Sequence, residues 1–328
     1  MRAPSLRCGP HLRQPSRAIA PATLLAACAG IALALAVGVL WAPEAQAQQP
    51  ELRAAASLII PGLGQAANGD WAEGGVHLGV ALVLVNQYDL LLKRDDYIKP
   101  GDRTDNDRNI RTNRTTFESE AYGTALTDLS FYSAYGAYRD ARQQIGNRGY
   151  ATPAPQESLA EAAYAPFQWE YLSRPTTWVP VLVALYGAVT PPGAQSYVYA
   201  PQGGLTRDEM AAGFAAQYEM VAVGEEAFFR GVLNNGLSSS LGETWGLVSS
   251  SAVFGIAHAG VGAQASGLEA GVFGLYLGWL HQRNDYDMRE GIAIHFWWDF
   301  LTGIAMLQQR KGQVGDRPVR LGQVTFHF

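Results

Sequence analysis

Two adjacent glutamates and an arginine stand in an apolar stretch of this 328-residue chain, where residues 224–231 read GEEAFFRG. Glu226 and Arg230 are four residues apart, so they share one face of a helix, whereas Glu225 points about 100° away. This spacing assigns Glu226 to an ion pair and leaves Glu225 free for chemistry. An isolated pattern of this kind is more often a surface ion pair, but the apolar residues on both sides favour burial.

Two histidines follow in apolar stretches further along the chain. His258 comes four residues after Phe254, and His295 comes four residues before Asp299, so each pair shares a helical face. One histidine in an apolar helix is more often a satisfied core residue than a catalytic group. The Glu-Glu-Arg stretch followed by two histidine motifs is less easily explained by chance, and we expect the three to form a common site.

The residue types suit hydrolysis by an activated water. Peptide hydrolysis without a serine or cysteine nucleophile needs that water, a base for its proton and donors for the oxyanion. Glu225 and His258 can take the proton and hold the water. The chain has two cysteines, Cys8 and Cys28, both near its start. A cysteine nucleophile, a cysteine-based zinc site and an internal disulfide are therefore excluded from the rest of the chain.

These motifs, with Arg230-Gly231 and the small-residue stretch 271–280, resemble the intramembrane family of type II CAAX prenyl endopeptidases and bacteriocin-processing or immunity proteins. The similarity runs from about residue 206 to residue 307. It implies a glutamate-dependent endopeptidase that acts on a peptide or a membrane protein. The implied site consists of Glu225 and His258 as water activators, Glu226 and Arg230 as a buried supporting pair, and His295 and Asp299 at the oxyanion.

Asp299 is the less common residue at its position, where the family more often has Asn. Asn offers an NH₂ donor to an oxyanion, whereas an ionised Asp can only accept a hydrogen bond. Asp299 is therefore expected to be protonated, to orient His295 or to serve a metal. Zinc is an open alternative, because these carboxylates and imidazoles are acceptable zinc ligands. The close-spaced H-E-x-x-H pair is missing, so no cofactor is predicted.

The composition, with 48% hydrophobic and 16% charged residues, is compatible with a membrane protein. A net charge of −5 and a pI near 5.7 give no sign of a nucleic-acid site. We expect an all-α polytopic membrane bundle with a polar, partly irregular insert after the N-terminal helices. The expected units are 1–47, a signal peptide or anchor; 48–93, a helical membrane hairpin; 94–174, the polar insert; 175–309, the protease-like core; and 310–328, a polar tail.

The first unit combines four arginines, an apolar run over residues 20–41 and an A-x-A motif at 45–47, which is typical of a cleaved signal peptide. Its apolar run is also long enough for an uncleaved anchor. A lipoprotein signal at Cys28 is the weaker alternative. Each version targets the chain to a bacterial secretion route and predicts a multi-pass protein of the inner membrane.

Further helices are expected at residues 73–92, 126–142, 158–165, 178–189, 206–237, 244–260, 266–281 and 291–308. We predict that helix 126–142 lies on the membrane or caps the core, and that 95–114 is a solvent loop. Two other functions stay open. One is a non-proteolytic immunity or assembly scaffold, and the other is a carrier whose buried Glu and His relay protons. Inverted repeats would support a carrier, and the sequence has none that we detect. Neither the substrate nor the oligomeric state is predicted.

Overall fold

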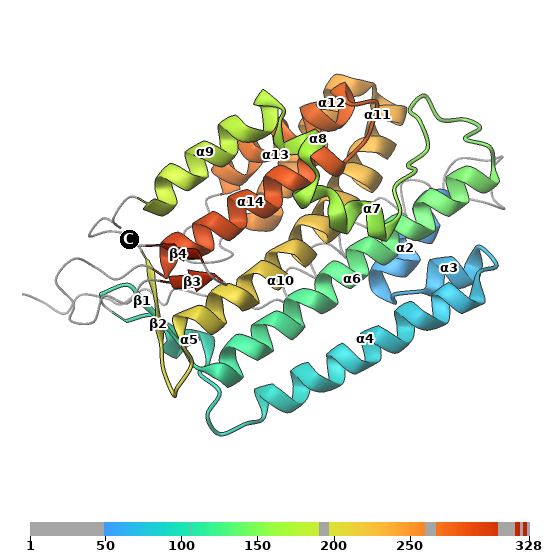
Figure 1. Cartoon of the computed structure of the whole chain (residues 1–328). Coiled ribbons are helices and arrows are strands. Elements are labelled where there is room, and N and C mark those ends of the chain that lie inside the picture. Colours follow the sequence, from blue (N-terminus) through green and yellow to red (C-terminus); the bar gives the residue numbers. More distant parts are fainter. Residues whose placement is uncertain are drawn as a thin grey trace, which may run out of the picture.

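The computed structural model describes residues 49–105, 107–189, 197–259 and 267–307, together with the backbone of two short strands beyond them. The predicted signal peptide or anchor over residues 1–47 lies outside this part of the chain. The described residues are mainly helical (Figure 1), as the all-α prediction requires.

The described residues contain fifteen helical segments. They are α2 (Pro50–Ile59), α3 (Leu63–Ala67), α4 (Trp71–Leu92), α5 (Pro100–Arg103), α6 (Arg114–Gln144), α7 (Leu159–Tyr164), η1 (Ala165–Phe167), α8 (Trp169–Leu172), α9 (Pro175–Val189), α10 (Arg207–Glu226), η2 (Ala227–Asn234), α11 (Asn235–Leu241), α12 (Glu243–His258), α13 (Gly267–Arg283) and α14 (Arg289–Met306). Two small sheets join β1 (Asn109–Thr112) in parallel to β2 (Val198–Pro201), and β3 (Val319–Leu321) antiparallel to β4 (Val324–Phe326).

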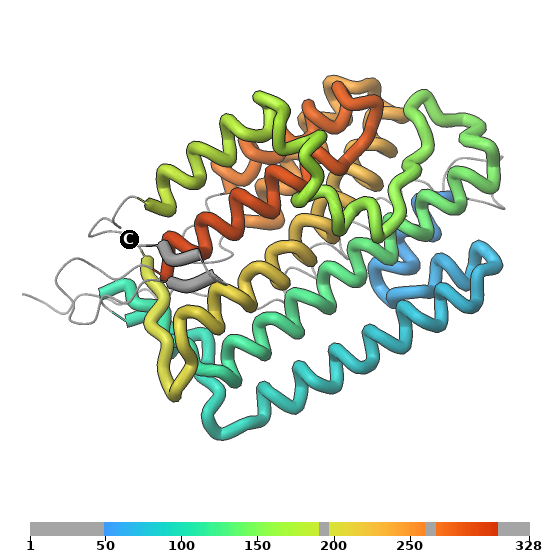
Figure 2. Tube along the Cα trace, viewed as in Figure 1, coloured from blue at the N-terminus to red at the C-terminus, as the bar shows by residue number. Residues whose placement is uncertain are grey.

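The long helices are stacked side by side (Figures 1 and 2). In this stack α6 packs against α4 and α10, α10 packs against α14, and α14 packs against α9. Helices α12 and α13 pack against each other, and both contact η2. The core therefore lies along α6, α10 and α14, and the motifs around Glu225, His258 and His295 belong to it or border it.

Helix α6 corrects one prediction. It extends well beyond residues 126–142, and it lies inside the stack instead of on the membrane surface or over the core. The polar residues on α6 led to the wrong location, because they suggested contact with water. In the structure Thr127 and Ser130 each donate to the carbonyl four residues earlier in the same helix, so these hydroxyls need no water.

The predicted solvent loop 95–114 also contains regular structure, namely α5 and β1. Strand β1 pairs with β2, a partner far away in the sequence, and local composition gives no signal for such a contact.

The segment α2–α3–α4, which covers most of the stretch predicted to be a helical membrane hairpin, is fixed to α6. Gly62, with a φ of 92°, lies in the left-handed region that favours glycine, and its N–H donates to Ser133 Oγ at 2.8 Å. The Gln65 side chain donates to the Ser133 carbonyl at 2.8 Å. A turn at Asn68-Gly69-Asp70 joins α3 to α4, and Asp70 caps α4 by accepting from Glu73 N. This hairpin thus forms one side wall of the stack.

The predicted helix from residue 206 begins with a capping box. The Thr206 hydroxyl accepts from Glu209 N, and the Glu209 carboxylate accepts from Thr206 N at 2.9 Å. Helix α10 then continues without a break into η2, which is a π-helix. Such segments hold more residues per turn and occur frequently at functional sites. The GEEAFFRG stretch spans the junction between the two.

One helix among the described residues, α4, is long and apolar enough to cross a membrane, with a mean hydropathy of 1.4. Helix α9 is apolar but shorter. Large apolar side chains remain exposed on both helices, and others are exposed on α12 and α13. The exposed side chains on α4 and α9 include Val76, Leu82, Val83, Leu90, Leu182, Val183 and Tyr186.

Candidate active site

The six side chains singled out in the sequence meet inside the bundle, on α10, η2, α12 and α14. Oε2 of Glu225 lies 3.4 Å from Nε2 of His258. The same oxygen lies 3.7 Å from Nε2 of His295. Residues from three separate motifs therefore surround one carboxylate.

Glu226 and Arg230 form an ion pair that is buried, with 2.9 Å between Oε1 and Nη1. Oε1 of Glu226 also lies 2.9 Å from Nδ1 of His295. A side chain at Gly291 would bring a Cβ atom to 3.1 Å from Glu226 Oε2, so the glycine leaves room for this carboxylate. The supporting pair predicted from the sequence thus also holds His295.

Arg230 connects three helical segments. Its guanidinium donates to the Gly274 carbonyl on α13 at 3.3 Å. It also lies 4.5 Å from the centre of the Phe254 ring on α12. An arginine over an aromatic face adds a cation–π attraction, which is stronger when the pair is desolvated.

The orientation of His258 is set by its own helix. Nδ1 lies 2.8 Å from the Phe254 carbonyl oxygen, which can only accept, so Nδ1 carries a proton. In the neutral ring this leaves Nε2 as an acceptor facing Glu225. The ring also stacks on Phe254 at a centroid distance of 4.2 Å. The F-x-x-x-H motif therefore supplies both the hydrogen-bond partner and the packing surface of this histidine.

His295 has a carboxylate at each ring nitrogen. Nδ1 faces Glu226, while Nε2 lies 3.4 Å from Oδ2 of Asp299. An imidazole can donate at both nitrogens only in its protonated form. The Asp299 side chain is 28% exposed, against 4% for His295, so Asp299 forms the open edge of the cluster.

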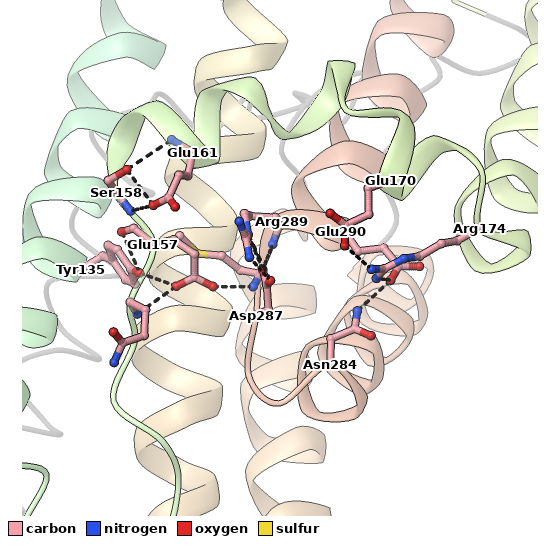
Figure 3. A network of polar contacts seen from close by, with 12 residues as sticks. Tyr135, Glu157, Ser158, Glu161, Glu170, Arg174, Asn284, Asp287, Arg289 and Glu290 are labelled. Atoms are coloured by element: carbon pink, nitrogen blue, oxygen red, sulfur yellow. Dashed lines mark hydrogen bonds and ion pairs between the residues drawn. The ribbon is translucent and has the colours of Figure 1, made fainter.

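The start of α14, which carries His295 and Asp299, is held by a polar network that the sequence analysis missed (Figure 3). Glu290 is 2% exposed and accepts from Arg174 and from Asn284, both at 2.7 Å. The Thr176 and Thr177 hydroxyls also donate to it. The sequence did contain one indication of this network. Glu290 is an acidic residue at the start of a predicted helix, where a negative charge complements the helix dipole.

A second part of this network ties the same helix start to α6. The Glu157 carboxylate accepts from the Met288 N–H at 2.9 Å and from the Tyr135 hydroxyl at 2.8 Å (Figure 3). In the adjoining turn, burial opposes ionisation of Asp287, but hydrogen bonds from Arg289 hold the pKa of its carboxyl below the ordinary value. The register of α14 against α6 is therefore fixed by charged and polar contacts at its first turn.

Asp128 on α6 is a seventh polar residue beside this cluster, and the sequence analysis did not select it. It is 6% exposed, and its Oδ2 has no hydrogen-bond partner among the described residues. A Cβ atom added to Gly224 would lie 2.6 Å from Cβ of Asp128, so the two helices touch at this point. The sequence feature that could have identified Asp128 is an acidic residue within a run of small and aromatic residues.

No three His, Cys, Asp or Glu side chains in the described part of the chain are placed so that they could hold a metal ion together.

Buried glutamates facing two histidines in a helical bundle define a class of site that can activate water without a serine or cysteine. Residues 209–301 match a family model described as Type II CAAX prenyl endopeptidase Rce1-like, which supports the family resemblance of the motifs. The matched segment contains all six residues selected in the sequence, whereas α6 and Asp128 lie outside it. No curated protein and no solved structure matches the chain.

Proposed function

We propose that this protein is an intramembrane endopeptidase that hydrolyses peptide bonds with a water activated by Glu225 and His258. The observation that carries the proposal is the 3.4 Å approach of these two side chains inside the segment matched by the peptidase family. Glu225 is the base, because its carboxylate is enclosed by the bundle and is not bound to Arg230, which pairs with Glu226. An ionised carboxylate beside His258 can accept the proton of a water bound between the two side chains.

His258 positions the water. Its Nδ1 proton is committed to the Phe254 carbonyl, so Nε2 can accept a hydrogen bond from a water that also donates to Glu225. That water is held by two acceptors and keeps a lone pair free for attack on the peptide carbonyl. Glu225 then receives the proton and can pass it to the leaving amine.

His295 stabilises the oxyanion, and Asp299 orients His295. A histidine flanked by Glu226 and Asp299 is held in its protonated form, which is a donor with a positive charge. Because His295 donates to the oxyanion, the residue at position 299 does not have to be a hydrogen-bond donor. An Asp can therefore replace the Asn that is more common in the family. The ion pair of Glu226 with Arg230 fixes the other side of the ring.

The bilayer is the proposed environment. The matched family is membrane-embedded, and the exposed apolar side chains on α4, α9, α12 and α13 suit contact with lipid. With the secretion-type segment at residues 1–47, we place the protein in a bacterial inner membrane as a multi-pass protein. Its partners are lipid and a peptide or membrane-protein substrate.

A comparison of two glutamine variants tests the peptidase proposal. Glu225→Gln keeps the volume of the side chain but removes the base, so turnover should fall at least about 100-fold while the protein still inserts. Glu219→Gln is the matched control, because it makes the same change on α10 away from the cluster. The membrane proteome of each strain is compared with that of the deletion strain. An uncut substrate should accumulate in the Glu225→Gln and deletion strains alone. Equal proteomes for both variants would instead support a binding scaffold.

A further inference from the structure

Asp128 is a buried acid that the proposed mechanism does not use. It reaches the cluster from α6, which lies outside residues 209–301. Its Oδ2 and the Oε2 of Glu225 are both buried, and neither has a hydrogen-bond partner among the described residues. A native protein rarely leaves a buried carboxyl oxygen unpaired without a functional reason.

The contact between α6 and α10 brings Asp128 against the residue that precedes Glu225. Gly224, the residue before Glu225, packs directly on the Asp128 side chain, with 2.6 Å between a Cβ built on the glycine and Asp128 Cβ. Any larger residue at 224 would push the helices apart. Asp128 lies within electrostatic reach of Glu225, Asp299 and His295.

The charges of the cluster do not balance if every acid is ionised. Four carboxyl groups face one guanidinium and two imidazoles, so a negative charge remains even when both histidines are protonated. An uncompensated charge in a buried site is costly, and two neighbouring buried carboxyls avoid it by retaining a proton. The charged and titratable groups around Asp128 and Glu225 are Glu226 and Arg230 on α10 and η2, His258 on α12, and His295 and Asp299 on α14, with Tyr218 of α10 beside Asp299.

Glu226 does not compete for this proton, because it is already paired with Arg230 and His295. Asp299 faces His295 at the open edge of the cluster. Asp128 has neither kind of partner. We propose that Asp128 and Glu225 hold one proton between them, which makes Asp128 a positioning residue that sets the pH range in which Glu225 is ionised. This inference rests on the proposed function of Glu225 as the base.

Infrared spectroscopy of the purified protein tests the shared proton without a substrate. A protonated carboxyl group has a C=O stretch that is separate from the carboxylate bands. The wild-type protein should show this band at neutral pH, and Asp128→Asn should lose part of its intensity, because Glu225 then ionises alone. Ser130→Ala is the matched control. It removes a buried hydroxyl of α6 that binds the Leu126 carbonyl of the same helix, so the band should stay unchanged.

The pH dependence of turnover provides the second readout, with the purified protein that accumulates in the Glu225→Gln strain as the substrate. Asp128→Asn removes a competing negative charge, so Glu225 should ionise at lower pH. The acid limb of kcat/KM should move down by about one pH unit, whereas Ser130→Ala should leave it in place.

Absence of the carboxylic acid band from the wild-type protein would overturn the proposal, even if Asp128→Asn does not fold. A folded Asp128→Asn variant with an unchanged band or an unchanged acid limb would overturn it as well. If the wild-type protein cleaves nothing at any pH, the peptidase function fails. In that case the infrared comparison alone decides whether the two acids share a proton.

Discussion

Asp299 shows at the level of one residue how the geometry narrows the choices left by the sequence. Its chemistry allowed a protonated donor, an orienting group or a metal ligand. The 3.4 Å approach of its Oδ2 to Nε2 of His295 favours the orienting role. The Asp is then an acceptor for a cationic imidazole instead of a donor to the oxyanion.

We expect Asp299→Asn to keep at least about a tenth of wild-type turnover, because the amide oxygen can still accept from His295 and the new NH₂ group can face the oxyanion. Asp299→Ala, which removes both groups, should lose about 100-fold. Initial rates on the accumulated substrate measure both. Equal losses in the two variants, or recovery of Asp299→Ala by added zinc, would contradict the orienting role.

Arg230 is expected to be structural. Arg230→Ala leaves Glu226 buried without its cation, which should destabilise the fold by about 3–5 kcal/mol and reduce the amount of folded protein in membranes. Arg283→Ala is the control, because Arg283 is an exposed arginine on α13 that also lies over a ring, that of Trp279. Thermal unfolding in detergent compares the two. Normal stability of Arg230→Ala with reduced turnover would place Arg230 in the catalytic step.

The sequence predicted contacts within a helix better than contacts between helices. The four-residue spacing identified the pair of Glu226 with Arg230, and the structure has it. The contact of Glu226 with His295 joins residues 69 positions apart, and no local pattern encodes such a distance. Asp128 was missed for the same reason, since its neighbours Gly224 and Glu225 belong to another helix.

At the level of helices, the first turn of α14 decides where two site residues lie. Glu290 joins this turn to the start of α9 through Arg174, and Asn284 holds it from the preceding turn. His295 lies about one and a half turns further along the same helix. A shift at Glu290 would therefore move the imidazole relative to Glu225.

We expect Glu290→Gln to lower the free energy of unfolding by about 2–3 kcal/mol, because a buried charge-assisted network loses its anion and gains an NH₂ group among donors. Glu170→Gln is a close control, since Glu170 binds the same Arg174 at 2.8 Å but its side chain is 65% exposed. It should change stability by less than about 1 kcal/mol. Denaturation of both variants in detergent gives the comparison. If Glu170→Gln lowered the free energy of unfolding as much as Glu290→Gln does, burial of Glu290 would not be the reason for its contribution to stability.

Helix α6 shows that an amphipathic pattern does not determine whether a helix lies on the surface or inside the bundle. Its aromatic stripe among polar residues is typical of an interfacial helix, and the predicted location followed from that amphipathic pattern. The pattern contained no information on whether hydroxyls bond to water or to their own helix, and in the structure those of Thr127 and Ser130 bond to the helix. The apolar helices, such as residues 73–92 and 178–189, were predicted closer to their actual bounds, because a long apolar run leaves few alternatives.

For the whole molecule, the exposed apolar side chains of α4 predict a direct contact with lipid. Val83 lies near the middle of α4 and is 59% exposed. An aspartate at the centre of a membrane helix costs about 2.5–3.5 kcal/mol on insertion scales. Val83→Asp should therefore reduce the fraction of protein that stays in membranes after alkaline extraction, and Val83→Leu should not. Equal retention of both variants would mean that α4 does not face lipid.

The close contact between Gly224 and Asp128 also limits which fragment of the chain can fold by itself or be transferred to another protein. Gly231 has a similar contact with the Tyr135 ring, so α6 covers both glycines of the GEEAFFRG stretch. A fragment cut to residues 209–301 would keep every residue of the family motifs. It would lack α6, however, so the helix surface at Gly224 and Gly231 would be exposed to solvent. The portion that the family model recognises is smaller than the portion that folds. An exchange of active sites between relatives would therefore have to include α6 as well as the motif helices.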